Sequence, residues 1–185
     1  KGFNVGAYTM AFKHPLLMSG YRNILFVLVV SLPINILLTL CCGYFMASKN
    51  IMFKGPIVAL IMFTMFFNAG MIPNYLNVRS LGLYDSLWAL ILPGALSVYN
   101  SVICKTAIEA VPDSLSESAY IDGANELQIL GRVIVPLCKP AIATFTLFHA
   151  VGHWNSYFNA TMYINDRNKW PLMLIVREMV AESGT

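Results

Sequence analysis

The chain of 185 residues is 57% hydrophobic and only 11% charged, with a formal net charge of +3. An ordinary soluble domain is about 45–50% apolar and about 25% charged, so one water-soluble globule could not bury this many apolar side chains. The basic residues are scattered and form no block that would favour a nucleic-acid partner. The composition therefore predicts an integral membrane protein in contact with the lipid bilayer, and it excludes a soluble domain.

Four intervals of the chain contain no charged side chain. They are bounded by Arg22 and Lys49, by Lys54 and Arg79, by Asp85 and Lys105, and by Lys139 and Asp166. A helix needs about 20 mostly apolar residues to cross a bilayer. Helices are expected because the intervals lack the alternation of a barrel strand. We predict an all-α polytopic transmembrane bundle with about four complete spans, at about 23–47, 57–77, 86–107 and 140–163.

Prolines and glycines interrupt the first three predicted spans. Neighbouring helices and polar side chains can satisfy the backbone groups that such residues release in a membrane. We therefore expect bent helices, either around a cavity or in kinked packing. The residues concerned are Pro33 in the first span, Gly70 and Pro73 in the second, and Pro93 and Gly94 in the third.

Both ends of the chain have the character of a fragment. Residues 1–20 are amphipathic and mixed, which predicts a surface segment and not a cleavable signal peptide. A new apolar run begins at Trp170, and the chain stops at Thr185. We expect one transmembrane domain, residues 1–185, that is truncated at both ends.

Cysteine and histidine offer little support for a metal site. The four cysteines lack the paired spacing of a zinc site and are interpreted as small hydrophobic residues. His149 and His153 are four residues apart, but no acidic residue lies between them as it does in a metalloprotease helix. The sequence therefore predicts no metal ligands.

The interval between Lys105 and Lys139 is the one stretch rich in charge. Within it, Ser114 and Glu117 stand at capping-box spacing, which predicts a short helix beginning at Ser114. This helix should stop near Asp122 and Gly123, because glycine accepts the left-handed conformation that ends helices. A second short helix at 124–133 should lead back into the membrane. We name residues 112–136 the elbow and expect it on one membrane surface.

The elbow contains a motif with a specific spacing. Glu117-Ser118-Ala119 is followed by three residues, Gly123, nine residues, and then Val133-Ile134-Val135-Pro136. This pattern resembles the EAA loop of ABC-importer permeases, with conservative departures at Ser118, Val133 and Val135. The segments around Asp122, Pro73, Trp88 and Trp154 are further similar to the maltose-type carbohydrate branch.

This resemblance implies a type I ABC-importer permease. Family members usually have six spans, with the loop in the cytoplasm between the fourth and fifth, so the chain would hold spans two to five. By the same resemblance the elbow is a coupling helix held in a cleft of the ATPase. Glu117 would make a polar contact to the ATPase, Ala119 would permit close approach and Gly123 would set the turn. Ser118, Asp122 and Pro136 belong to the same motif.

The resemblance also implies partners and a location. These are a dimer of ABC ATPase subunits, a second homologous permease subunit and an extracytoplasmic solute-binding protein, at the bacterial cytoplasmic membrane. The chain contains no Gly-x4-Gly-Lys-Ser/Thr phosphate loop, so we expect a transport subunit that is not an enzyme. It would need no cofactor of its own, since the ATPase would bind ATP and Mg.

Polar side chains near the predicted spans could line a path for a sugar. Ser31, Asn35 and Thr39 share one helix face, as do Thr146, His149, His153 and Ser156. Trp154, Asn155, Tyr157 and Asn159 combine hydrogen-bonding groups with flat apolar surface, which suits a neutral glycan. The proposed path residues are His149, His153, Trp154, Asn155 and Asn159. The alternative is that such residues join helices by hydrogen bonds.

Other functions remain open. A carrier driven by protons or sodium usually keeps ionisable groups within its spans, and the four intervals between the bounding charges contain no carboxylate, lysine or arginine. A membrane-embedded enzyme would have only the two histidines as its centre. An importer of an amino acid, polyamine or phosphate is a further alternative, although anionic cargo favours arginine or lysine in the path. In the orientation that the resemblance implies, five basic residues lie on the cytoplasmic side and six on the outer side, so the distribution of basic residues does not decide the orientation.

Overall fold

The computed structural model describes residues 15–49 and 51–183, with side chains as far as residue 181. Every regular element within these residues is a helix. The predicted all-α fold class is therefore confirmed for this part of the chain. Most of the surface segment predicted at residues 1–20 lies outside the described residues.

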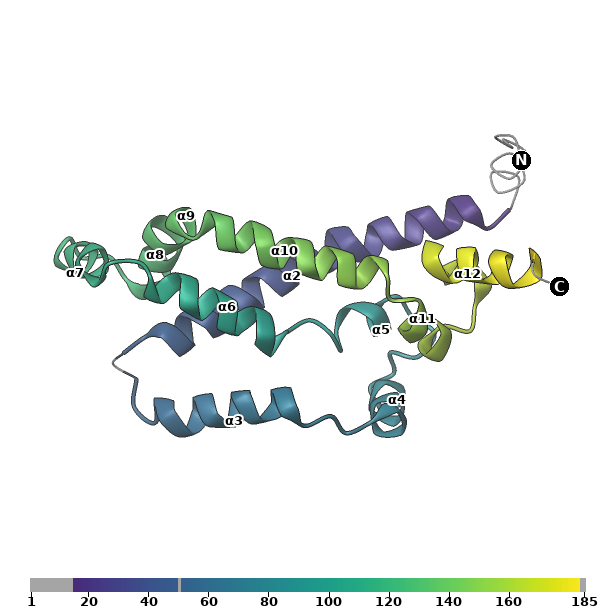
Figure 1. Cartoon of the computed structure of the whole chain (residues 1–185), viewed down its shortest axis with the longest axis horizontal. Helices are drawn as coiled ribbons and strands as arrows, with labels where there is room; N and C mark the ends of the chain where they lie inside the picture. Colours follow the sequence, from purple (N-terminus) through teal and green to yellow (C-terminus); the bar gives the residue numbers. More distant parts are fainter. Residues whose placement is uncertain (1–14, 50, 184–185) are drawn as a thin grey trace, which may run out of the picture. The chain divides into compact units, whose positions relative to one another are not determined.

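Helix α2 (Leu17–Ala47) confirms the first predicted span (Figure 1). Its 31 residues extend over about 46 Å at about 1.5 Å per residue, which exceeds the roughly 30 Å of a bilayer core. The helix begins before predicted residue 23, ends where expected, and contains Pro33. Among the described residues, it is the one unbroken helix long and apolar enough to cross a membrane.

The other predicted spans are divided into shorter helices, so the expected bends are breaks in the helix. The second becomes α3 (Lys54–Phe66) and α4 (Met71–Ser80), the third α5 (Trp88–Ile91) and α6 (Val98–Glu109), and the fourth α10 (Lys139–Trp154) and α11 (Tyr157–Tyr163). Gly70 precedes α4 with a φ of 93°, which L side chains rarely adopt. Pro93 and Gly94 lie between α5 and α6. By length and composition, α2 passes as a span within the described part. Two bent pairs, Lys54–Phe66 with Met71–Ser80 and Glu126–Leu137 with Lys139–Trp154, bring the number to three if each pair is one span.

The described residues form two compact units. Within the described part, unit 1 comprises residues 15–31, 70–94 and 150–183, and unit 2 comprises residues 32–49, 51–69 and 95–149. Each unit has its own buried residues and is described by itself.

Unit 1 is held together by a small cluster of buried side chains and by close packing of α2 against a second helix. Val78, Ala89 and Tyr163 form one buried cluster. A Cβ at Gly20 of α2 would lie 2.5 Å from Ile175 Cδ1 and 3.2 Å from the Leu172 Cα, in α12 (Leu172–Ser183). Glycine at this position therefore allows the first turns of α2 to pack directly against α12.

In unit 2, helices α2 and α6 approach each other closely. A Cβ at Gly43 of α2 would lie 2.7 Å from Cys104 Sγ and 2.8 Å from Cys104 Cβ in α6, so the glycine lets these helices touch. One cluster of buried apolar residues in unit 2 consists of Leu40, Ala47, Cys104, Ile108, Ile129, Ile134, Cys138 and Phe145.

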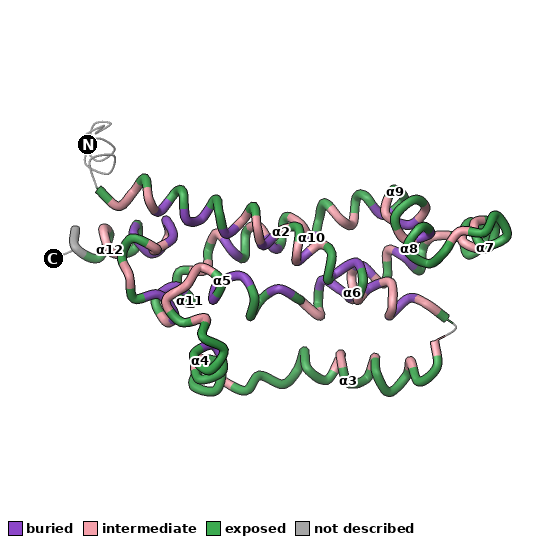
Figure 2. The backbone as a smooth tube through the Cα atoms, turned by 180° about the vertical axis from the view of Figure 1, so that it is seen from behind, coloured by how far each residue is buried: buried purple, intermediate pink, exposed green. Residues whose placement is uncertain are grey.

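Helix α3 of unit 2 does not belong to a buried core. None of its residues is buried, and it is exposed or intermediate along its length in Figure 2. Leu60 is 66% exposed and Phe66 is 78% exposed. An apolar surface of this kind requires lipid or a protein partner around it.

Candidate functional site

The first helix of the elbow is α7 (Asp113–Ile121), and its start differs from the prediction. The N-cap position is Pro112, and no side chain caps the helix. The predicted capping box of Ser114 and Glu117 is therefore wrong, because Ser114 already lies inside the first turn. Proline suits the start of a helix, where its missing N–H costs nothing.

The predicted end of α7 is confirmed. Gly123 has a φ of 81°. Its N–H donates to the Tyr120 carbonyl at 3.0 Å, and the Ala124 N–H donates to the Ala119 carbonyl at 2.9 Å. This pair of bonds is a Schellman motif, which satisfies the last carbonyls of a helix and requires a left-handed residue at this position.

The second predicted helix, 124–133, is shorter and composite. Helix α8 (Glu126–Ile129) starts with a capping box in which Asn125 and Gln128 exchange two hydrogen bonds of 2.9 Å. A π-helical turn, η1 (Leu130–Ile134), and α9 (Val135–Leu137) follow. The chain from Glu126 to Leu137 then bends by 86° into α10. The elbow thus ends in a sharp turn at the start of α10.

The predicted coupling residues lie on and beside α7, which adjoins α8 at one end of unit 2 (Figure 1). Glu117, Ser118, Asp122 and Gly123 are exposed, and Pro136 is exposed in α9. Ala119 is half-buried and packs against the core of unit 2. None of the residues of α7 is buried. The helix therefore offers most of its surface to a partner while Ala119 faces the core.

A carboxylate joins the elbow to α2. Glu126 accepts hydrogen bonds from the hydroxyl groups of Tyr44, at 2.5 Å, and Tyr120. These two bonds lower the pKa of Glu126, with Tyr120 as the larger cause, and the bond to Glu126 raises the pKa of Tyr120. At the other end of α7, Lys49 pairs with Asp113. Sequence reasoning missed this arrangement, because Tyr44 and Glu126 are 82 residues apart.

A buried polar cluster lies inside unit 2. The His149 ring nitrogens lie 3.2 Å from Asn35 Nδ2, 3.4 Å from Thr39 Oγ1 and 3.0 Å from Asn100 Nδ2. Asn35 and Thr39 are 0% exposed, Asn100 5% and His149 7%. The predicted polar face of α2 is thus confirmed for Asn35 and Thr39, and it contacts the predicted path residue His149. Asn100 was not predicted.

The remaining predicted path residues belong to unit 1. His153 is 8% exposed, and its carbonyl accepts the Ser156 hydroxyl at 2.7 Å. Trp154 is half-buried, while Asn155 and Asn159 are exposed. The Asn155 amide donates to the Val151 carbonyl at 3.0 Å, within its own helix end. Among the described groups, the side chains of Trp154 and Asn159 make no hydrogen bond or ion pair, so they are available for contact with a sugar.

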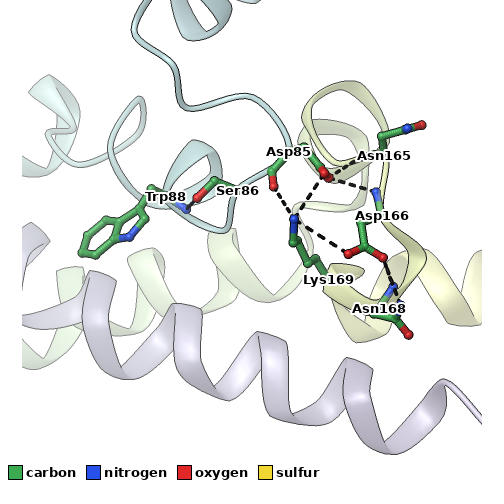
Figure 3. Close-up of polar contacts among 7 residues, drawn as sticks. All are labelled: Asp85, Ser86, Trp88, Asn165, Asp166, Asn168 and Lys169. Carbon is green, nitrogen blue, oxygen red and sulfur yellow. Dashed lines mark hydrogen bonds and ion pairs between the residues drawn. The ribbon is translucent and has the colours of Figure 1, made fainter.

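Unit 1 also contains a polar loop contact that was not predicted (Figure 3). Asp85 Oδ1 accepts the N–H groups of Asn165 and Asp166 at 3.0 and 2.9 Å. Lys169 Nζ donates to the Asp85 carbonyl at 2.9 Å and to Oδ2 at 3.2 Å. The Asp166 N–H is the main cause that lowers the pKa of Asp85. This carboxylate fixes the loop before α5 to the loop before η2 (Arg167–Lys169).

One exposed cation in unit 1 lies against an aromatic ring. The Arg177 guanidinium of α12 is 4.5 Å from the centre of the Tyr157 ring in α11. Within the described residues, histidine, cysteine and acidic side chains form no group of three that could hold a metal ion.

Comparison with known protein families gives one extended match. The sequence model described as "Binding-protein-dependent transport system inner membrane component" matches residues 7–173, which includes the whole elbow.

Two proteins of Bacillus subtilis (strain 168) are similar over almost the whole chain. One is the polygalacturonan/rhamnogalacturonan transport system permease protein YtcP, 40% identical over 98% of this chain and 64% of its own. The other is protein LplC, 41% identical over 97% of this chain and 61% of its own. The chain therefore spans less than two thirds of the length of these relatives.

A solved structure has the same fold. It belongs to a bacterial ABC transporter involved in the import of the acidic polysaccharide alginate. Its matched chain is 33% identical, with a TM-score of 0.92 over 97% of this chain and 64% of that one.

Proposed function

Because the chain belongs to the family of binding-protein-dependent transport system inner membrane components, we propose that it is a permease subunit of an ATP-driven saccharide importer. It spans the bacterial cytoplasmic membrane several times and carries an oligosaccharide inward. The chain performs no catalysis and needs no cofactor of its own. A separate dimer of ATPase subunits binds ATP and Mg, a second homologous permease completes the pathway, and an extracytoplasmic binding protein delivers the cargo.

The observation that carries this proposal is the geometry of the elbow. A short exposed helix is stopped at Gly123 by a Schellman motif and adjoins a second, capped helix. This gives a stiff segment that a partner can hold. Glu117 makes the polar contact to the ATPase, Ala119 allows α7 to approach the core, and Gly123 fixes the turn. Ser118 and Asp122 complete the contact surface, and Pro136 begins the return to the membrane.

The cargo proposal rests on the relatives together with exposed groups of unit 1. YtcP is named for the transport of polygalacturonan and rhamnogalacturonan, and the solved structure for the import of the acidic polysaccharide alginate. The expectation of a neutral glycan depended on the absence of arginine from the four predicted spans. Arg177 lies beyond them in α12, beside the ring of Tyr157, and guanidinium groups suit carboxylates. We favour an oligosaccharide that carries carboxylates.

The path residues divide into two groups. Trp154, Asn155 and Asn159 suit sugar contact, because they offer an aromatic surface and amides at or near the protein surface. His153 supports the turn between α10 and α11 through its carbonyl. His149 would reach a sugar only if its contacts with Asn35, Thr39 and Asn100 opened. We therefore assign it a smaller part in recognition.

The cargo is tested with the intact permease pair, its ATPase and its binding protein in proteoliposomes. ATP turnover and uptake are measured with uronate oligosaccharides, neutral oligosaccharides, amino acids and polyamines. We expect saccharides to stimulate both, and uronate oligosaccharides most strongly. Stimulation by amino acids or polyamines alone would contradict a saccharide cargo.

The elbow is tested in the same preparation. Replacing Glu117 by alanine removes a charged hydrogen-bonding group, a change of about 1.5–3 kcal/mol when such a contact is made. We expect ATPase association to weaken by about tenfold or more. Glu109→Ala removes a carboxylate from α6, outside the elbow, and serves as the control. Normal association and normal coupled transport in Glu117→Ala would refute the assigned contact.

A further inference from the structure

Helices α2 and α7 are far apart in the chain, and noncovalent contacts bring them together. Along the chain, α7 leads from α6 and continues into α8. A force applied to α7 therefore reaches α6 and α10 through the backbone. Two polar contacts bridge this separation. Tyr44 of α2 binds Glu126 of α8 across 82 residues, and Lys49, just after α2, binds Asp113 of α7 across 64 residues. The movement of α2 with α7 depends on these contacts.

Glu126 connects α7 to α2 through both of its carboxylate oxygens. Its two carboxylate oxygens receive hydroxyl groups from different elements, Tyr120 of α7 and Tyr44 of α2. Hydrogen bonds to an ionised carboxylate are about twice as strong as neutral ones. The depressed pKa of Glu126 agrees with a carboxylate that is ionised between two donors. One side chain thus holds the last turn of α7 against the last turn of α2.

Two further contacts support the same connection. Lys49 pairs with Asp113 at the opposite end of α7. The Lys49 side chain is 70% exposed and the Asp113 side chain 65% exposed. A pair this exposed contributes little by itself. In addition, Ala119 of α7 and Tyr44 of α2 are partly buried against the apolar cluster that contains Leu40 and Ile129. Helix α7 is therefore joined to α2 through Glu126 at one end and to Lys49, just after α2, at the other.

We propose that Glu126 is a positioning residue that makes α2 move together with α7. The inference rests on the proposed function, in which the ATPase moves α7. Glu126 itself need not touch the ATPase or the cargo. It carries displacement of α7 into the long span α2, and the tyrosine hydroxyls on either side determine whether the two helices move as one body.

The test removes one hydroxyl at a time. Tyr44→Phe leaves Tyr120 on Glu126 but releases α2, and Tyr120→Phe releases α7. Each variant is assembled with the ATPase and binding protein in proteoliposomes, and oligosaccharide uptake per ATP hydrolysed is measured. We expect this ratio to fall at least threefold in both, with ATPase association and basal hydrolysis retained. The double variant should be no worse than either single one. Tyr99→Phe, at an exposed tyrosine of α6, should behave as the parent.

A distance measurement covers the case in which transport is lost altogether. Spin labels at Ser48→Cys and Ser114→Cys, in a chain without its native cysteines, report the separation of α2 and α7 through the ATP cycle. We expect a constant distance in the parent and a changed or broadened one in Tyr44→Phe.

The failures are distinguishable. Parent-like uptake per ATP in Tyr44→Phe and Tyr120→Phe, with a constant label distance, would overturn the role of Glu126. If Glu117→Ala still lost ATPase association, the proposed function would stand. If Glu117→Ala were also normal, the proposed contact between the elbow and the ATPase would fall with it.

Discussion

Two parts of unit 2 use polar side chains in opposite ways. In the seam between α2, α6 and α10, defined by Asn35, Thr39, Asn100, His149 and the contact of Gly43 with Cys104, the polar groups are almost completely buried. In the elbow, Glu126 and its neighbours are exposed. Buried polar groups must keep their partners or pay for desolvation, whereas exposed ones can exchange partners with water. The seam is therefore suited to fixing helix positions, and the exposed face of α7 to making contacts with a partner.

The largest effect is expected from filling the seam. In Gly43→Ala the new Cβ would stand 2.7 Å from Cys104 Sγ and 3.2 Å from the Lys105 backbone nitrogen. Overpacking of this kind costs about 1–3 kcal/mol. Thermal unfolding of the purified subunit should show the loss, and adding Cys104→Gly should recover part of it. Gly55→Ala, where a Cβ meets nothing within 4 Å, is the control. Equal stability of Gly43→Ala and Gly55→Ala would show that the helices are not in close contact.

Next comes removal of the imidazole. His149→Leu leaves Asn35, Thr39 and Asn100 without the ring, and three interhelical contacts at about 0.6 kcal/mol each give a loss of roughly 2 kcal/mol. The same thermal assay measures it. The variant should keep the cargo preference of the parent. A changed preference at unchanged stability would instead make His149 a recognition residue.

A smaller effect is expected at the end of α7. Gly123→Ala places a Cβ on a residue with a φ of 81°, although no atom lies within 4 Å of that Cβ. The cost is therefore purely conformational, about 1 kcal/mol. Hydrogen exchange of the α7 amides should accelerate. Gly131→Ala, also without a contact within 4 Å, should leave exchange unchanged, and similar exchange in both variants would argue against the turn.

The smallest effect concerns acid. The folded pKa of Glu126 is lowered by Tyr120 and then by Tyr44, so the ionised form contributes stability above the ordinary carboxyl pKa of about 4.3. That contribution is lost as the pH falls through the folded pKa. The stability difference between the parent and Glu126→Gln should therefore be present at neutral pH and shrink below about pH 4.3. A difference that grows on acidification would contradict the assigned hydrogen bonds.

Local signals in the sequence predicted much of the fold. Long intervals without charge predicted α2, and glycine chemistry predicted the stop at Gly123. The start of α7 was missed because a serine and a glutamate at capping spacing competed with Pro112, which the structure uses as the N-cap. Asn125 and Gln128 also stand at capping-box spacing in the sequence, and this pattern could have predicted the start of α8.

Contacts distant in the sequence could not be predicted in the same way. Asn100 joins His149 across 49 residues, and Tyr44 joins Glu126 across 82. Neither pairing leaves a periodic trace, because the helix faces that meet are decided by tertiary packing. The division of the later spans into short helices was also only partly visible, since prolines and glycines indicate where a helix is weak and not whether it breaks.

Transfer of work from an ATPase into the elbow is tested most directly by cross-linking. A photoreactive amino acid placed at Glu117 in the assembled importer, irradiated in inside-out membrane vesicles, should form an adduct with the ATPase subunit, whereas the same group at exposed Leu60 of α3 should not. Absence of that adduct, together with adducts to the extracytoplasmic binding protein or to lipid, would place the elbow where no ATPase could move it.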